Sequence, residues 1–178
     1  MIIGLSGKKG SGKSYYTSYI IKTYNFIELS FAYPLKKSLE LILNLSYDEL
    51  YGEKKDSYNN QYHCYNRELM QWLGTEVFRE EFNKKFNYNG SVWVDNVKNI
   101  ILQNPNKNYV ISDVRFLNEI EMIKSLNGII INIKDNNINQ DNHKSENQKL
   151  IYDYQIINLK TLENTLSNYT ILDNIINK

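Results

Sequence analysis

The feature that most constrains this chain is its glycine-rich start, MIIGLSGKKGSGKS, which holds four of the eight glycines in the sequence. Residues 7–14 fit the pattern G-x-x-x-x-G-K-[S/T], which in phosphate-binding loops joins a buried strand to a helix. Residues 1–5 form an apolar run typical of a buried strand, and residues 13–24 carry apolar side chains at helical spacing. Pattern and setting together predict a loop that binds nucleotide phosphates.

Each residue type in this loop suits an anion. Glycines allow backbone conformations closed to other residues and let successive N–H groups point at a phosphate, while the following helix adds its positive N-terminal end. Lys13 is expected to reach the β- and γ-phosphates, and the Ser14 hydroxyl to contribute a ligand to Mg²⁺. A glycine-rich turn with incidental lysines is the alternative. The predicted ATP-binding residues of the motif are Gly7, Gly10, Ser11, Gly12, Lys13 and Ser14.

Charge and composition exclude several classes of function. The 21 Lys and Arg residues and 20 Asp and Glu residues give a net charge of +1, which argues against a surface that binds nucleic acid directly. The single cysteine, Cys64, excludes an intramolecular disulfide, and with two histidines the chain offers no zinc-binding set. No apolar run approaches the roughly 20 residues that span a bilayer, and nothing resembles a signal peptide. We therefore expect a cytoplasmic protein that binds no membrane.

Strand and helix patterns alternate along the chain, which favours a three-layer α/β fold with a largely parallel sheet. The length suits a single domain. A capping-box spacing at Ser46 and Glu49 predicts a short helix, and the polar residues 134–149 are interpreted as an exposed loop or lid. Further strands are expected at residues 26–31, 109–112, 129–133 and 154–158, and further helices at residues 34–45, 67–86, 92–103, 116–126 (with Gly128 as the C′ residue) and 159–176.

Two of the three arginines of the chain fall in one segment, RELMQWLGTEVFREEF. Guanidinium groups hold phosphate through paired hydrogen bonds, whereas lysine acts as a point charge. A helix break at Gly74, with Thr75 capping a second helix, would divide this segment into two. Alternatively, the arginines pair with glutamates of the same segment, and the polar face is only solvated. In a continuous α-helix, residues spaced by four rotate by only about 40° per step, which would place four polar side chains on one face: Arg67, Gln71, Thr75 and Arg79.

The third arginine, Arg115, follows Asp113 at the end of an apolar run, in VISDVRF. The carboxyl ends of parallel strands are where α/β proteins bind ligands. A carboxylate there could hold Mg²⁺ through water or orient an attacking phosphate, and Arg115 could reach the same site. The alternative is that Asp113 caps the helix that is expected near residue 116.

Taken together, GLSGKKGSGKS, SFAYPLKKSL, RELMQWLGTEVFRE, VWVDNV, VISDVRFLNEIEMIKSLNGIIINI and HKSE resemble the phage and large-virus deoxynucleoside monophosphate kinases. The segments follow in order along nearly the whole chain. The resemblance implies the three-layer α/β/α P-loop kinase fold of the nucleoside monophosphate kinase superfamily in a single domain, residues 1–178. It implies a core of residues 1–30, 86–134 and 149–178, a helical acceptor-binding region near residues 31–85 and a lid near residues 135–148.

The resemblance also implies an activity and the residues that perform it. Such viral enzymes move the γ-phosphate of ATP, with Mg²⁺, to a deoxynucleoside monophosphate for DNA synthesis, and the resemblance makes a homodimer plausible. By resemblance, Lys9 joins Lys13 at the donor phosphates, Asp113 joins Ser14 at the metal, and the catalytic residues are Lys13, Asp113 and Arg115. The implied acceptor residues are Phe31, Lys36, Arg67, Gln71, Thr75, Arg79, Trp93 and Arg115, and those of the lid are Lys134, His143 and Lys144.

Two departures from the family pattern and two other functions stay open. Relatives often carry aspartate where this chain has Ser14, and arginine where it has Lys134. A P-loop kinase could instead phosphorylate a non-nucleotide acceptor, such as phosphomevalonate or dephospho-coenzyme A. A P-loop ATPase or nucleotide-binding switch is the alternative from another class.

Overall fold

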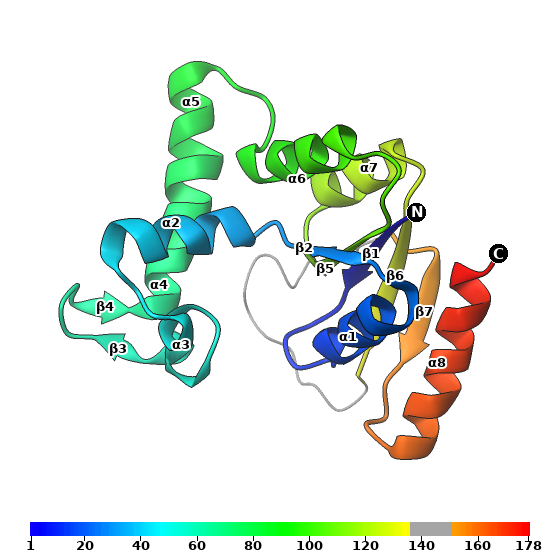
Figure 1. The fold of residues 1–178 in the computed structure, drawn as a ribbon. Helices are drawn as coiled ribbons and strands as arrows, with labels where there is room; N and C mark the ends of the chain where they lie inside the picture. The colour runs from blue at the N-terminus through cyan, green and yellow to red at the C-terminus, as the bar shows by residue number, and fades with distance from the viewer. Residues whose placement is uncertain (136–150) are drawn as a thin grey trace. The chain divides into compact units, whose positions relative to one another are not determined.

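The computed structural model of the chain describes residues 1–135 and 151–178 (Figure 1). The chain divides into two compact units. Unit 1 comprises Met1–Ser30 and Ile101–Lys178, and unit 2 comprises Phe31–Ile100. No helix within the described ranges combines the length and apolar character that a membrane crossing requires. His143 and Lys144, and all but the first residue of the expected lid, lie outside the described residues.

A five-stranded sheet forms the centre of unit 1, with the strand order β2-β5-β1-β6-β7. Every neighbouring pair in it is parallel, which confirms the predicted parallel sheet. The first strand therefore lies in the middle, paired on both sides. The strands are β1 (Ile2–Ser6), β2 (Ile27–Leu29), β5 (Tyr109–Val114), β6 (Ile129–Lys134) and β7 (Tyr154–Ile157).

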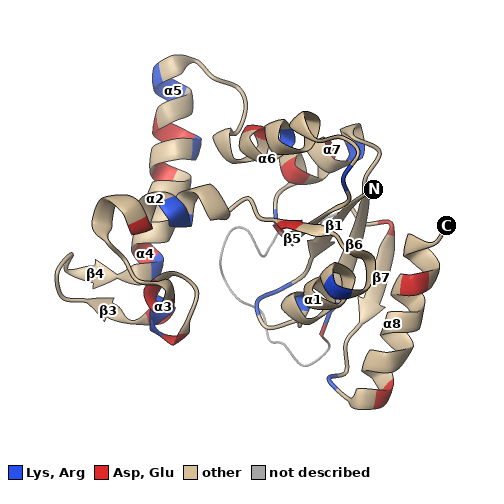
Figure 2. Cartoon of the chain, in the orientation of Figure 1, with Lys and Arg blue, Asp and Glu red and all other residues tan. Residues whose placement is uncertain are grey.

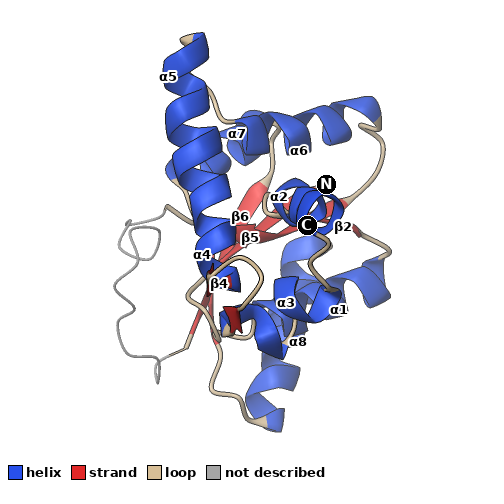
Figure 3. Cartoon of the chain, turned by 90° about the vertical axis from the view of Figure 1, so that its left-hand side faces the viewer, coloured by secondary structure: helices blue, strands red, loops and turns tan. Residues whose placement is uncertain are grey.

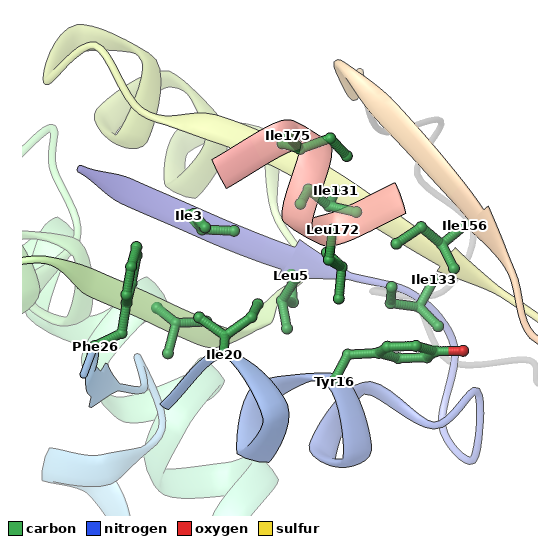
Figure 4. Packing of buried hydrophobic residues seen from close by; sticks show 11 residues of the cluster. Ile3, Leu5, Tyr16, Ile20, Phe26, Ile131, Ile133, Ile156, Leu172 and Ile175 are labelled. Atoms are coloured by element: carbon green, nitrogen blue, oxygen red, sulfur yellow. The ribbon is translucent and has the colours of Figure 1, made fainter. Parts of the chain in front are cut away.

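Helices cover both faces of this sheet, as the three-layer prediction requires. Side chains alternate along a strand, so Ile3 and Leu5 of β1 point to one face, where they pack with residues of α1 (Lys13–Tyr24) and α8 (Leu162–Ile176) (Figure 4). Gly4 faces the other way, where a Cβ would stand 2.8 Å from Ile123 of α7 (Leu117–Ser125). The side chains of this core are apolar except for the hydroxyl group of Tyr16. Their burial stabilises the unit because it removes apolar surface from water.

The two ends of α7 are held by side-chain and backbone contacts of known type. Glu119, only 1% exposed, accepts hydrogen bonds from the backbone N–H groups of Arg115 (2.7 Å) and Phe116 (3.0 Å). At the other end, Asn127 takes the left-handed conformation (φ 58°) and Gly128 follows it. Gly128 donates to the Ile123 carbonyl and Asn127 to that of Lys124, a Schellman motif. The expectation of Gly128 as the C′ residue is therefore wrong, because asparagine also tolerates this conformation.

Unit 2 is helical with one small hairpin. The predicted cap at Ser46 is confirmed, since its hydroxyl accepts from the Glu49 N–H while the Glu49 carboxylate accepts from the Ser46 N–H. The hairpin was not predicted; its turn includes His63 with φ 54°. The elements are α2 (Tyr33–Leu43), α3 (Tyr47–Leu50), the 3₁₀-helix η1 (Glu53–Asp56), β3 (Tyr58–Asn59), β4 (Cys64–Tyr65), α4 (Asn66–Gln71), the π-helix η2 (Trp72–Glu81), α5 (Phe82–Phe86) and α6 (Val92–Gln103), the last of which continues into unit 1.

We predict that Glu119→Ala lowers the free energy of unfolding by about 1–3 kcal/mol, because two half-buried backbone donors at the start of α7 lose their buried acceptor. Glu121→Ala is the matched control, since Glu121 is an exposed residue of the same helix. Urea unfolding of both variants measures the difference. Equal, small effects would show that Glu119 does not hold this helix end.

Candidate functional site

The loop between β1 and α1, residues 7–12, turns at three glycines with left-handed backbone conformations. Their φ angles are 141° at Gly7, 77° at Gly10 and 93° at Gly12. A Cβ at Gly7 would overlap the carbonyl oxygen of Ile133, and one at Gly12 would overlap the side-chain amide of Asn158. Both conformation and space thus require glycine at Gly7 and Gly12. We call this segment the glycine loop.

Lys13 and Ser14 begin α1 directly after the glycine loop. The Lys13 Nζ donates hydrogen bonds to the carbonyl oxygens of Gly7 and Lys8, the latter at 2.9 Å, so its positive charge lies over the loop backbone. The first turn of α1 contains no acidic residue, and Figure 2 shows basic colour along the loop before it. Phosphate binds well to the groups that meet here: a helix N-terminus, a lysine ammonium and the backbone N–H groups that glycines expose.

Ser11 lies inside the glycine loop and is fully buried. Its backbone N–H donates to the Lys8 carbonyl at 3.1 Å, which closes a tight turn. Its Oγ is a buried atom with no hydrogen-bond partner among the residues that the structure describes. A buried polar atom without a partner is uncommon in folded proteins and is found where a site awaits a ligand or stores strain.

The carboxyl ends of β1, β2 and β5 bring further polar side chains to the same edge of the sheet. Ser6 is level with Val114 and with Asn132 in the strand register. The Ser30 hydroxyl, one residue beyond β2, donates to the Asp113 Oδ2 at 2.7 Å. Asp113 thus lies at the edge where parallel sheets bind ligands. Ser30 was missed by the sequence analysis, because only the pairing of β2 with β5 brings it to Asp113.

The alternative role of Asp113 as the cap of α7 is not what the structure shows. Glu119, in the first turn of α7, accepts the hydrogen bonds at this end of the helix instead. Arg115 follows β5 directly, with its backbone fixed by Glu119 and its side chain half-buried. Mg²⁺ is commonly held by one or two carboxylates together with substrate phosphates. Asp113 and the Ser14 hydroxyl fit that chemistry, and no cluster of three or more His, Cys, Asp or Glu side chains stands beside them in the described ranges as another metal site.

In unit 2, α4, η2 and α5 form one uninterrupted helix (Figure 3), so Gly74 does not break it and Thr75 is not a cap. From residue 66 to residue 77, burial along this helix repeats every four residues, which is longer than the α-helical period of 3.6. The buried residues are Asn66, Met70 and Gly74, and the exposed ones are Glu68, Trp72, Glu76 and Glu80. Between them lie four half-buried residues: Arg67, Gln71, Thr75 and Arg79.

The change from α- to π-geometry explains this period of four. Four residues of an α-helix pass a full turn by about 40°. A π-helix bonds residue i to i+5 and holds more residues per turn, so four residues of η2 stop short of a full turn. The two rotations have opposite sense and offset each other. The steady drift that an α-helix would impose is therefore absent, and the four polar residues from Arg67 to Arg79 keep one face of the helix.

The other expected acceptor residues of unit 2 have defined partners. Arg67 forms an ion pair with Asp56 of η1, not with a glutamate of its own helix. The Lys36 Nζ lies 3.9 Å from the centroid of the Tyr51 ring. Trp93 of α6 donates its indole N–H to the Gly74 carbonyl oxygen at 3.0 Å, and its ring meets Phe78 edge to face. Phe31 is buried.

The described residues therefore distribute the expected site over the two units. The glycine loop, Lys13, Ser14, Asp113 and Arg115 belong to unit 1, as does Lys134, the exposed last residue of β6. Lys9 lies in the glycine loop. The acceptor residues named by resemblance other than Arg115 all belong to unit 2: Phe31, Lys36, Arg67, Gln71, Thr75, Arg79 and Trp93.

The strand order, with the glycine loop after the central strand, defines the α/β P-loop kinase fold. The structure of TT1252 from Thermus thermophilus shares the fold with a TM-score of 0.50 at 14% identity, over 98% of this chain and 97% of its own. Dephospho-CoA kinase from Campylobacter jejuni aligns with a TM-score of 0.49 at 16% identity, over 98% and 96% of the two chains.

Sequence comparison identifies the family. Residues 43–168 match the family described as deoxynucleotide monophosphate kinase. A protein of Acanthamoeba polyphaga mimivirus that carries the name of a deoxynucleotide monophosphate kinase is 36% identical over 178 residues, 92% of this chain and 91% of the relative. The chain belongs to the deoxynucleotide monophosphate kinase family. It is a phosphotransferase that uses a nucleotide phosphate donor and acts on a nucleotide, which confirms the predicted class of enzyme.

We predict that Trp93→Phe destabilises unit 2 by about 1–2 kcal/mol, because the buried Gly74 carbonyl loses its indole donor while the aromatic packing is largely kept. Trp72→Phe is the control, since Trp72 is 50% exposed and Trp93 only 7%. Urea unfolding followed by circular dichroism compares the two variants. A Trp93→Phe variant as stable as Trp72→Phe would mean that this hydrogen bond does not support η2.

Proposed function

We propose that this kinase moves the γ-phosphate of ATP, with Mg²⁺, to a deoxynucleoside monophosphate and so forms the diphosphate for DNA synthesis. The observation that carries the proposal is the glycine loop, whose glycines, buried Ser11 and overlying Lys13 provide a cradle for the phosphates of the donor. Family membership supplies the acceptor class. The single P-loop kinase domain, the homodimer and the cytoplasm of a host cell stay predictions of the family resemblance.

In unit 1, the proposal assigns the donor. The backbone N–H groups of the glycine loop and the N-terminus of α1 bind the phosphates, and Lys9 and Lys13 add positive charge. Ser14 and Asp113 hold Mg²⁺, which, when bound, offsets charge on the β- and γ-phosphates. The Ser30 hydroxyl fixes one carboxylate oxygen of Asp113, which leaves the orientation of that side chain defined before any substrate binds.

In unit 2, the proposal assigns the acceptor. The face of the α4–η2–α5 helix that carries Arg67, Gln71, Thr75 and Arg79 offers two guanidinium groups, an amide and a hydroxyl, which are all donors to a phosphate. The ion pair with Asp56 fixes the Arg67 guanidinium, whose five N–H donors exceed what one carboxylate can accept. Phe31, Lys36 and Trp93 are assigned to the rest of the acceptor site.

Transfer itself needs two phosphate groups held in line and their mutual repulsion offset, with little covalent chemistry from the protein. An oxygen of the acceptor monophosphate attacks the γ-phosphorus, and the bond to the β-phosphate oxygen breaks. Lys13 and Arg115 lie at the carboxyl edge of the unit 1 sheet, and we assign them to the charge that develops on the moving group. Lys134, His143 and Lys144 stay predicted lid residues.

The proposal is tested by offering acceptors to the purified chain with ATP and Mg²⁺. The panel consists of the four deoxynucleoside monophosphates, the matching ribonucleotides, phosphomevalonate and dephospho-coenzyme A. We expect diphosphate from at least one deoxynucleotide, measured by chromatography, and none when Lys13 is replaced by alanine. Product only from a non-nucleotide acceptor, or ATP hydrolysis with no acceptor product, would contradict the proposal.

Arg79 tests the assignment of the acceptor to unit 2. Arg79→Ala is expected to raise the KM for the monophosphate by about 10- to 100-fold, the cost of a charge-assisted hydrogen bond, and to leave the KM for ATP nearly unchanged. Lys85→Ala is the control, because it removes an exposed positive charge from the same helix. Steady-state kinetics with each substrate varied separates the two constants. Equal rises in the KM for ATP and the KM for the monophosphate would contradict the assignment of Arg79 to the acceptor.

A further inference from the structure

Asn158, which directly follows β7, contacts the glycine loop although it lies 147 positions after Ser11 in the sequence. Its side-chain Nδ2 donates a hydrogen bond to the Ser11 carbonyl oxygen at 2.9 Å. The same Nδ2 occupies the space that a Cβ of Gly12 would need. The residue is 6% exposed. One buried amide thus touches both residues of the Ser11–Gly12 peptide unit.

The orientation of this amide is fixed from two other directions. The backbone N–H of Asn158 donates to the Lys134 carbonyl oxygen at 2.8 Å, which ties it to the end of β6. Its Oδ1 accepts from the N–H of Lys160 at 3.1 Å. Because the oxygen is taken by a donor, the nitrogen is the group that faces Ser11, and each polar end of the amide has a matching partner. Aspartate, which has no donor when ionised, cannot reproduce both bonds.

The direction of the Ser11 carbonyl matters for phosphate binding. A peptide unit is planar and trans, so its C=O and N–H groups point in opposite directions. When Asn158 holds the Ser11 carbonyl on its own side, the N–H of Gly12 is turned to the opposite side of the loop. In phosphate-binding loops, the backbone N–H groups that lead into the helix are the ones that cradle phosphate.

We propose that Asn158 is a positioning residue for the phosphate donor: it sets the orientation of the Ser11–Gly12 peptide, and with it the direction of the Gly12 N–H. The inference rests on the donor half of the proposed function and deepens it. It adds a residue from the far end of the chain to a site that the motif alone places within residues 7–14. Asn158 itself need not touch the nucleotide.

The test compares the affinity of the full chain for ATP with Mg²⁺, measured by titration calorimetry without any acceptor. Asn158→Ala and the isosteric Asn158→Asp are expected to weaken binding about 5- to 10-fold or more, as the loss of one hydrogen bond predicts. Asn168→Ala is the matched control. Asn168 is also buried, and its Nδ2 also donates to a backbone carbonyl, that of Ile157, next to Asn158.

The expected result is a weaker affinity in the Asn158 variants and unchanged affinity in Asn168→Ala, whatever the three variants do to urea stability. In kinetics, the KM for ATP rises while the KM for the acceptor stays constant. Unchanged ATP affinity in the Asn158 variants would overturn the inference, and so would an equal loss in Asn168→Ala, which would mean that general loosening is responsible.

A measurement on the unmodified chain covers the case in which the Asn158 variants do not fold. The side-chain amide resonances of Asn158 are expected to shift in nuclear magnetic resonance spectra when ATP and Mg²⁺ are added. No shift, with binding seen elsewhere in the glycine loop, would overturn the inference.

A chain that binds ATP through this arrangement but phosphorylates no deoxynucleotide would contradict the proposed acceptor and leave the role of Asn158 standing.

Discussion

The rest of the structure depends on the turn that the backbone makes between β1 and α1. β1 is hydrogen-bonded on both sides, to β5 and to β6, so its end is fixed in the middle of the sheet. The chain must then reverse into α1 within a few residues while it turns its N–H groups to one side. Only glycine adopts the required φ angles at Gly7 and Gly12 without strain or overlap. The same sheet places the ends of β2, β5 and β7, where Ser30, Asp113 and Asn158 lie.

A second constraint governs unit 2, where a helix has to present polar side chains in a straight line. A pure α-helix rotates residues spaced by four steadily around its axis. The π-helical stretch Trp72–Glu81 rotates them back, and burial repeats with a period of four over residues 66–77. The indole of Trp93 supports this stretch at the Gly74 carbonyl. Such stretches are rare and often found at functional sites, which agrees with the assignment of the acceptor to this helix.

Features that depend on neighbouring residues in the sequence could be predicted, and those that depend on distant contacts could not. The phosphate-binding motif, the Ser46 capping box and the alternation of strands and helices are local patterns, and all three are found in the structure. The hydrogen bonds from Asn158 to Ser11 and from Ser30 to Asp113 join residues 147 and 83 positions apart, so no local sequence pattern predicts them. The π-helix was missed because its residues also suit an α-helix.

The central claim is that unit 1 binds the phosphate donor and unit 2 the acceptor, and spectra of the isotope-labelled chain test it most directly. Addition of ATP with Mg²⁺ alone is expected to shift the backbone amide resonances of residues 7–14. Addition of a deoxynucleoside monophosphate alone is expected to shift those of residues 67–79. A monophosphate that shifts the glycine loop and leaves the helix of unit 2 unchanged would contradict this division of the two substrates.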